Sequence, residues 1–306
     1  MLPASILAQL GPRPDDPRPV LLVVAGPTAV GKTALCVRLA QRFSTEIVSA
    51  DSRQFFREMS IGTAKPTPEE MQGVPHHFID SHSIAEDYSA GRFAADALAK
   101  LDKLFQKHPL VVLTGGSGLY VQAVTDGLDE LPGVLPEVRA RLQAELAAHG
   151  LGPLVAELAA TDPVAHARID PQNPQRVLRA LEITRGTGRP FSSFHTQDTA
   201  AREAARPFRV VKVALTRQRE ELYQRINQRV DNMLAEGLLD EVKRLLPHRH
   251  RPALQTVGYQ EIFGFLDGDY DWAEAVRLLQ RNTRRYAKRQ LTWLRRDAAY
   301  EWIACQ

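Results

Sequence analysis

Gly26-Pro27-Thr28-Ala29-Val30-Gly31-Lys32-Thr33 follows the apolar run 20–25 and precedes a helical pattern over residues 34–43. A strand that enters a Gly-rich turn and then a helix aims several backbone N–H groups and the positive helix end at one point, where a phosphate group binds. The spacing GxxxxGK[ST] in this context predicts a loop that holds a di- or triphosphate. It leaves open whether the phosphate is transferred, hydrolysed or expelled.

The composition is that of an ordinary soluble chain. Its 306 residues are 44% hydrophobic and 25% charged, which is enough for roughly two cores. The two cysteines, Cys36 and Cys305, are too few for a disulfide framework or a metal cluster, so we expect a reducing compartment, the cytoplasm. Residues 1–19 are rich in proline and are expected to form a flexible leader. No segment approaches the roughly 18 apolar residues of a membrane span.

Strand-like and helical runs alternate up to residue 128. Apolar runs over 46–50 and 110–113 flank a helical stretch over 90–105, and a further strand is expected over 208–215. This alternation predicts an α/β fold, with a P-loop NTPase-like parallel sheet and helices on both faces.

The middle of the chain reads as helical throughout. Helix starts are marked by Pro136, Asp162-Pro163 and Asn173-Pro174, and stops by Gly150 and Gly186. We therefore expect an all-helical insertion domain over 131–205, which interrupts a core domain made of residues 20–130 and 206–306.

The positive charge gathers near the C-terminus. Residues 277–296 contain eight Lys or Arg and no Asp or Glu. At about 100° per residue these eight fall within one sector of roughly 140°, away from Tyr286 and Trp293, for which core packing is the simpler use. Solvated helix faces usually mix charges of both signs, so this stripe favours a polyanion, and nucleic acid over anionic lipid. Its members are Arg277, Arg281, Arg284, Arg285, Lys288, Arg289, Arg295 and Arg296.

Asp51 is the one well-placed acid. It ends the short run 47–50, at the sheet edge where open α/β folds bind ligands. Its carboxylate could be a metal ligand, a general base or the cap of the following turn with Ser52. The later strand ends in Thr114-Gly115 without the acid that kinases use to hold Mg²⁺.

Several motifs, in order from Val20 onward, resemble the tRNA dimethylallyltransferase family, bacterial type. Besides the loop 26–33 they are Val48–Ser52, Gly62–Pro66, Gly115–Tyr120, Pro174–Arg176 with Arg179–Glu182, Val257–Tyr259 and Lys288–Arg295. Two places depart from the family pattern, Gln255-Thr256 and Ser117-Gly118, and neither removes a charged catalytic group. The chain has no Cys/His pattern at its end.

This resemblance implies transfer of a prenyl group from dimethylallyl diphosphate to N6 of the adenosine just 3′ of the anticodon. It implies that the loop 26–33 binds the diphosphate, that Asp51 is the general base, that Lys32 and Arg229 stabilise the leaving group and that Thr33 places Mg²⁺. By sequence alone Arg229 reads as one more exposed helical arginine.

The resemblance also implies contacts with the anticodon stem-loop of tRNA, whose target base must be turned out into a pocket. We expect a monomer that binds no membrane. The residues implied at the RNA are Asp51, Ser52, Arg53, Gln54, Ser117, Arg139, Gln175, Arg176, Val177, Leu178, Arg179, Thr256, Val257, Gly258, Tyr259, Gln260, Lys288, Arg289, Gln290 and Arg295.

Three other functions stay open. An adenylate isopentenyltransferase would act on a free nucleotide, which needs neither the basic stripe nor the helical insertion. A P-loop small-molecule kinase is disfavoured by the missing later acid. An RNA-binding module without activity would not need Asp51.

Overall fold

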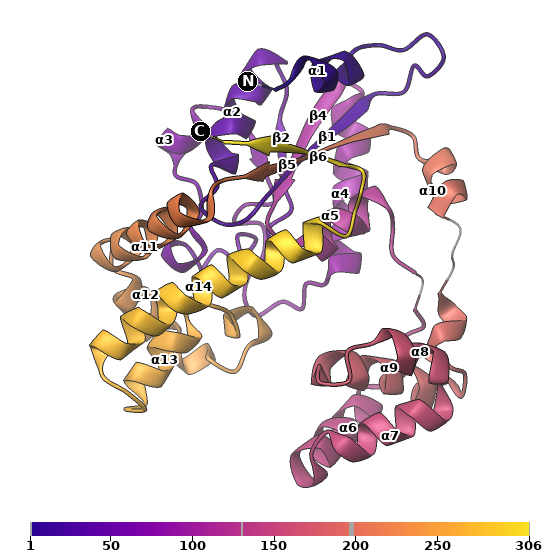
Figure 1. The fold of residues 1–306 in the computed structure, drawn as a ribbon, viewed down its shortest axis with the longest axis vertical. Helices are drawn as coiled ribbons and strands as arrows, with labels where there is room; N and C mark the ends of the chain where they lie inside the picture. The colour runs from indigo at the N-terminus through magenta and orange to yellow at the C-terminus, as the bar shows by residue number, and fades with distance from the viewer. Residues whose placement is uncertain (1, 130, 196–198, 306) are drawn as a thin grey trace. The chain divides into compact units, whose positions relative to one another are not determined.

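A computed structural model describes residues 2–129, 131–195 and 199–305 (Figure 1). The chain divides into two compact units, one formed by residues 1–127 and 205–306 and the other by 128–204. These limits lie within three residues of the core and insertion domains expected from the sequence.

The first unit is built on one six-stranded sheet whose strands all pair in parallel, in the order β3-β2-β4-β1-β5-β6. The α/β fold predicted from the alternating pattern is confirmed. The strands are β1 Val20–Ala25, β2 Ile47–Ser49, β3 His76–His77, β4 Leu110–Gly115, β5 Arg209–Thr216 and β6 Tyr300–Ala304.

Both faces of the sheet are buried, as a central parallel strand requires. Alternate residues of β1 divide between two hydrophobic clusters: Leu22 lies with the helix that follows the phosphate loop, and Leu21 lies with the helix of residues 90–105. Cys36 is buried in the first cluster, where it packs as a small apolar residue. The covering helices are α1 Ala4–Leu10, α2 Lys32–Arg42, α4 Ala90–Phe105 and α5 Gly118–Thr125.

A third hydrophobic cluster lies among the helices at the C-terminal end of the chain, where α11 and α14 pack side by side (Figure 1). Buried Tyr259, Phe263 and Leu279 belong to it, together with Met59 from the loop after β2. Its helices are α11 Arg219–Ala235, α12 Leu238–Leu245, α13 Gln260–Leu266 and α14 Trp272–Leu294. Short turns complete the unit, namely α3 Pro68–Met71, η1 Ile61–Thr63, η3 Leu246–His248 and η4 Pro252–Leu254.

The second unit is helical and has its own core. Leu142, Leu158, Val177 and Leu181 are buried within it. The predicted start signals hold, since Asp162 and Asn173 cap the helices that follow them through side-chain hydrogen bonds. Its elements are α6 Pro136–His149, α7 Gly152–Thr161, α8 Pro163–Arg168, α9 Pro174–Thr187 and η2 Phe191–Phe194, and α10 Thr199–Ala205 leads back to the first unit.

The N-terminal segment differs from the flexible leader that its prolines suggested. Residues 4–10 form α1, and Leu2, Ile6 and Leu10 are buried against the first cluster of the sheet. The prolines are confined to residues 12–19, apart from Pro3. The apolar residues Leu2, Ile6 and Leu10, spaced four apart, form one face by which α1 packs on the sheet. None of the described helices is long and apolar enough to cross a membrane.

Candidate functional site

The phosphate-binding loop adopts a conformation that requires its glycines. Gly31, at φ 107°, caps α2 from the left-handed region, so that the N–H groups of the first turn stay open toward a ligand. Gly26, at φ 154°, lies against β5, and a Cβ there would meet the Leu215 carbonyl oxygen at 3.0 Å. The loop is therefore packed closely on the end of the sheet.

Several cationic side chains converge on this loop. The Lys32 ammonium donates to the carbonyls of Gly26 and Pro27, at 3.0 and 2.9 Å. Arg229, from α11, donates to the Thr28 hydroxyl at 3.2 Å, and Arg225, one turn earlier, donates to the Ala29 carbonyl at 2.8 Å. Positively charged groups thus lie around the loop whose N–H groups are expected to bind phosphate.

Asp51 lies at the end of β2 with its two oxygens in different surroundings. Oδ1 accepts the backbone N–H groups of Arg53, at 3.0 Å, and Gln54, at 3.4 Å. Oδ2 faces Gly116, where a Cβ would come within 3.8 Å of it. The two hypotheses from the sequence, a turn cap and a general base, are therefore compatible, because Oδ1 binds the turn and Oδ2 takes no part in it.

These groups line one cavity of about 280 Å³. The charge of Asp51 acts on both Lys32 and Arg229, which places the carboxylate within electrostatic reach of the loop's cations. Burial lowers the pKa of Arg229, with partial compensation from Glu70 and Asp51. The lining includes Lys32, Thr33, Asp51, Arg225, Arg229 and Gln290. The phosphate-binding loop and the Asp51 carboxylate thus line the same cavity.

The known proteins that this chain resembles in sequence and in fold belong to one family. The IPP transferase family matches residues 54–297. The chain belongs to the IPP transferase family. A protein of Cytophaga hutchinsonii named tRNA dimethylallyltransferase is 53% identical over 283 residues, which cover 92% of each chain.

Solved structures agree with this family membership. A tRNA isopentenylpyrophosphate transferase from Bacillus halodurans is 41% identical, with a TM-score of 0.69 over 94% of this chain and 90% of that one. A eukaryotic dimethylallyltransferase acting on tRNA, 24% identical over 94% of this chain and 74% of its own, shares the fold at a TM-score of 0.74. The chain is accordingly an enzyme of the transferase class.

In this IPP transferase, Gln290 of α14 joins two of the loops that form the cavity. Its amide accepts the Thr28 N–H at 2.8 Å and donates to the Gly116 carbonyl at 2.9 Å, and the residue is 8% exposed. Tyr259 is fully buried as well. The Tyr259 side chain is enclosed and hydrogen-bonded to Glu241, which does not fit its expected contact with RNA. Gln290 lines the cavity, so its expected contact with RNA stays a prediction.

Aromatic residues of α14 have two different uses. Trp293 packs on Gly118, where a Cβ would lie 2.2 Å from the indole, in keeping with the predicted packing role. Tyr286 lines the cavity instead, and burial together with the charge of Asp51 raises its pKa to about 12. Its hydroxyl thus stays protonated. Ser117 and Ser52 are joined through their hydroxyls at 2.9 Å.

The helical unit presents an arginine pair around one carboxylate. Glu182 of α9 accepts from Arg139 at 3.2 Å and from Arg179 at 3.0 Å, while the carboxylate's side chain is only 9% exposed. Val177 and Leu178 are buried in the core of this unit, so their predicted role as RNA contacts does not fit their side chains. Gln175 and Arg176 are exposed on the same helix.

Sequence reasoning missed Arg225 and Glu70 as cavity residues. A signal for Arg225 was available, because residues four apart on a helix share a face and Arg229 was already a candidate. The sequence gave no such signal for Glu70, because its spacing from Thr67 is that of a capping box. The structure contains this capping box.

We expect diphosphate affinity to fall as pH rises above about 8. Burial lowers the pKa of Lys32 to about 8, although Asp51 opposes the shift, so the ammonium that attracts the anion is present below this pH and lost above it. Affinity should then drop toward tenfold per pH unit, which calorimetric titration with inorganic diphosphate between pH 7 and 9.5 would measure. Lys32→Arg keeps its charge over this range and should show a flatter profile.

Proposed function

We propose that this enzyme transfers the dimethylallyl group of dimethylallyl diphosphate to N6 of the adenosine just 3′ of a tRNA anticodon, with release of diphosphate. The observation that carries the proposal is the shared cavity, in which a phosphate-binding loop with added arginines meets the carboxylate of Asp51. The names of the matched tRNA-modifying relatives support the same substrates.

The loop and its cations would hold the donor's diphosphate. As the C–O bond breaks, negative charge grows on the leaving group, and fixed positive groups stabilise that state more than the intact donor. Lys32, Arg225 and Arg229 supply this charge, and the N–H groups of the first turn of α2 bind the phosphate oxygens.

The donor set also fits a magnesium ion. Among the described residues no group of three or more His, Cys, Asp or Glu side chains could hold a metal. Mg²⁺ commonly keeps several waters and is bound by one or two protein groups plus phosphate oxygens, so the Thr33 hydroxyl suffices. When bound, the ion would neutralise charge on the departing diphosphate.

Asp51 would remove the proton from the acceptor amine. The N6 lone pair is delocalised into the purine ring, so attack on the prenyl carbon is helped when a base takes the proton as the N–C bond forms. Oδ2 suits this task, because Oδ1 is held by the N–H groups of Arg53 and Gln54 and keeps the carboxylate oriented.

The function test uses purified protein, dimethylallyl diphosphate, Mg²⁺ and unmodified tRNA. We expect a prenylated adenosine, detected as a mass gain in the nucleosides of the tRNA. Prenylation of AMP in place of tRNA would indicate an adenylate isopentenyltransferase, and ATP turnover with an acceptor present would indicate a kinase. The monomeric state and cytoplasmic location remain predictions.

The basic stripe of α14 is expected to bind tRNA phosphates. Arg285, Lys288 and Arg289 are exposed, whereas Arg284 is tied to Asn227 and Arg277 to Glu274. Changing the three exposed residues to Gln should weaken tRNA binding and flatten its salt dependence by about one unit of slope per lost phosphate contact. Filter binding at several salt concentrations measures this. Arg277→Gln is the control, and equal loss of diphosphate affinity would contradict the assignment.

A further inference from the structure

A carboxylate away from the phosphate loop organises one wall of the cavity. Glu241 of α12 is 2% exposed, and it accepts three successive backbone N–H groups, those of Ser60, Ile61 and Gly62, at 3.0, 2.9 and 3.0 Å. Its fourth donor is the Tyr259 hydroxyl at 2.7 Å. Burying a charge is costly unless it is well hydrogen-bonded, and four donors on one carboxylate satisfy it.

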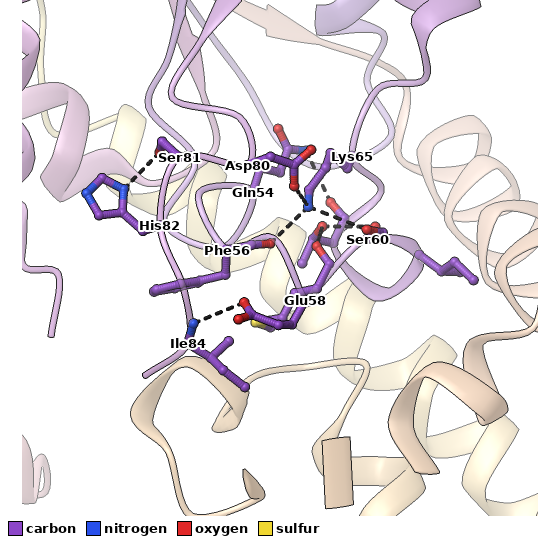
Figure 2. Close-up of polar contacts among 12 residues, drawn as sticks. Gln54, Phe56, Glu58, Ser60, Lys65, Asp80, Ser81, His82 and Ile84 are labelled. Carbon is purple, nitrogen blue, oxygen red and sulfur yellow. Dashed lines mark hydrogen bonds and ion pairs between the residues drawn. The ribbon is translucent and has the colours of Figure 1, made fainter. Parts of the chain in front are cut away.

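The same loop is held from its other end. The Lys65 ammonium reaches back to the Phe56 carbonyl at 2.9 Å and also pairs with Asp80, as Figure 2 shows. The Gln54 amide donates to the carbonyls of residues 63 and 64, at 3.2 and 3.0 Å. The backbone of residues 60–65 is therefore fixed by side chains at both ends.

Close packing leaves this loop little room to adjust. A Cβ on Gly62 would lie 2.6 Å from the Tyr259 ring, so the backbone of the loop rests directly on the aromatic face. The Tyr259 hydroxyl ends on Glu241, and burial beside that carboxylate raises the pKa of the tyrosine. Glu241 thus anchors both the loop and the ring against which the loop packs.

What Glu241 anchors belongs to the proposed active site. Gly62, Thr63 and Ala64 line the cavity, as do residues 256–258 next to Tyr259. Gln54, which holds residues 63 and 64, donates its own N–H to Asp51 Oδ1. A continuous set of hydrogen bonds therefore leads from Glu241, through the loop, to the catalytic carboxylate.

We propose that Glu241 is a positioning residue, which fixes the wall formed by residues 61–64 so that Asp51 and the acceptor base meet in the productive geometry. This inference rests on the proposed prenyl transfer. Glu241 touches neither phosphate nor base in this scheme. Its loss should lower kcat and leave the binding of diphosphate unchanged.

The test is Glu241→Gln. One end of a glutamine amide is a donor, so in either orientation it faces at least one backbone N–H that now lacks an acceptor. A misplacement of about 1 Å can cost up to 10²-fold, so we expect kcat for tRNA prenylation to fall about tenfold to a hundredfold. Diphosphate affinity should stay within about twofold, since the loop 26–33 is untouched.

Amide hydrogen exchange supplies a readout that separates anchoring from general destabilisation. In Glu241→Gln the amides of residues 60–62 should exchange at least about tenfold faster, while those of β1 and β4 keep their protection. Glu241→Asp, which keeps the charge but draws it back by one methylene, should show the same pattern more weakly. It serves if the glutamine variant fails to fold.

Two further variants serve as controls for Glu241→Gln. Tyr259→Phe removes one donor of four and should cost no more than about threefold in kcat. Glu58→Gln alters an exposed carboxylate that accepts from Ile84 of a neighbouring loop (Figure 2) and from the Ser83 hydroxyl. Glu58 does not line the cavity, so the activity of this variant should match wild type.

Unchanged kcat in both Glu241 variants would overturn the inference. Reduced kcat with wild-type exchange at residues 60–62 would overturn it equally. Wild-type protein that prenylates no tRNA would instead refute the proposed function, and the exchange data would still decide whether Glu241 anchors the loop.

Discussion

Asp51→Asn should slow prenyl transfer by roughly 10² to 10⁴ with tRNA affinity nearly unchanged, the usual range for loss of a general base. The asparagine keeps the shape of the side chain, and its amide oxygen can still accept the N–H groups of Arg53 and Gln54. The side chain loses its negative charge and, with it, the ability to take a proton. The expected defect is therefore chemical and leaves the turn after β2 intact.

Single-turnover kinetics with saturating donor and tRNA would measure this effect, because it isolates the chemical step from product release. Glu70→Gln is the matched control, since Glu70 is the other carboxylate that lines the cavity and its side chain caps α3. We expect the control to retain transfer within about fivefold. Transfer by Asp51→Asn at the wild-type rate would rule out the general-base role.

Local patterns sufficed to predict the sheet and the phosphate loop. The apolar run 20–25 coincides with β1, and the helical periodicity over 90–105 coincides with α4. These elements are encoded by neighbouring residues, through period-2 and period-3.6 burial and through a glycine at the left-handed start of α2. Asp51 was found in the same way, from its place at the end of a strand.

The hydrogen bonds that hold the loops around the site could not be predicted from local patterns. Gln290 bridges Thr28 and Gly116, and Glu241 binds residues 60–62, yet each contact joins positions far apart in the chain. A glutamine or glutamate on a helix reads as solvated until the fold shows what it meets. The strand β6 was missed for a related reason, because its five residues gain their pairing only from β5.

The buried tyrosine and aliphatic residues among the predicted RNA contacts illustrate the opposite error. The resemblance marked whole motifs, and within a motif it does not separate side chains that face a ligand from those that support the backbone. Val177 and Leu178 pack inside the helical unit, while Arg176 on the same turn is exposed. Burial is the physical property that sorts these positions.

Lys32→Met should lower kcat for prenyl transfer by about 10² to 10³, the cost typical of losing one group that stabilises developing negative charge. The methionine retains the unbranched shape in a buried position. Burial lowers the pKa of Lys32 to about 8, which means that the fold disfavours the charge of this ammonium group. The variant should therefore melt at or above the wild-type temperature.

Loss of activity without loss of stability is what separates a catalytic lysine from a structural one. Lys32→Arg restores the positive charge but not the compact ammonium, and it should recover only part of the rate. Lys65→Met is the comparison, because the Lys65 side chain is only 7% exposed but is paired with Asp80 and holds its own loop, so its replacement should lower the melting temperature. A large fall in the melting temperature of Lys32→Met, in parallel with its rate, would mean that the ammonium supports the loop by binding the carbonyls of Gly26 and Pro27 and does not act on the leaving diphosphate.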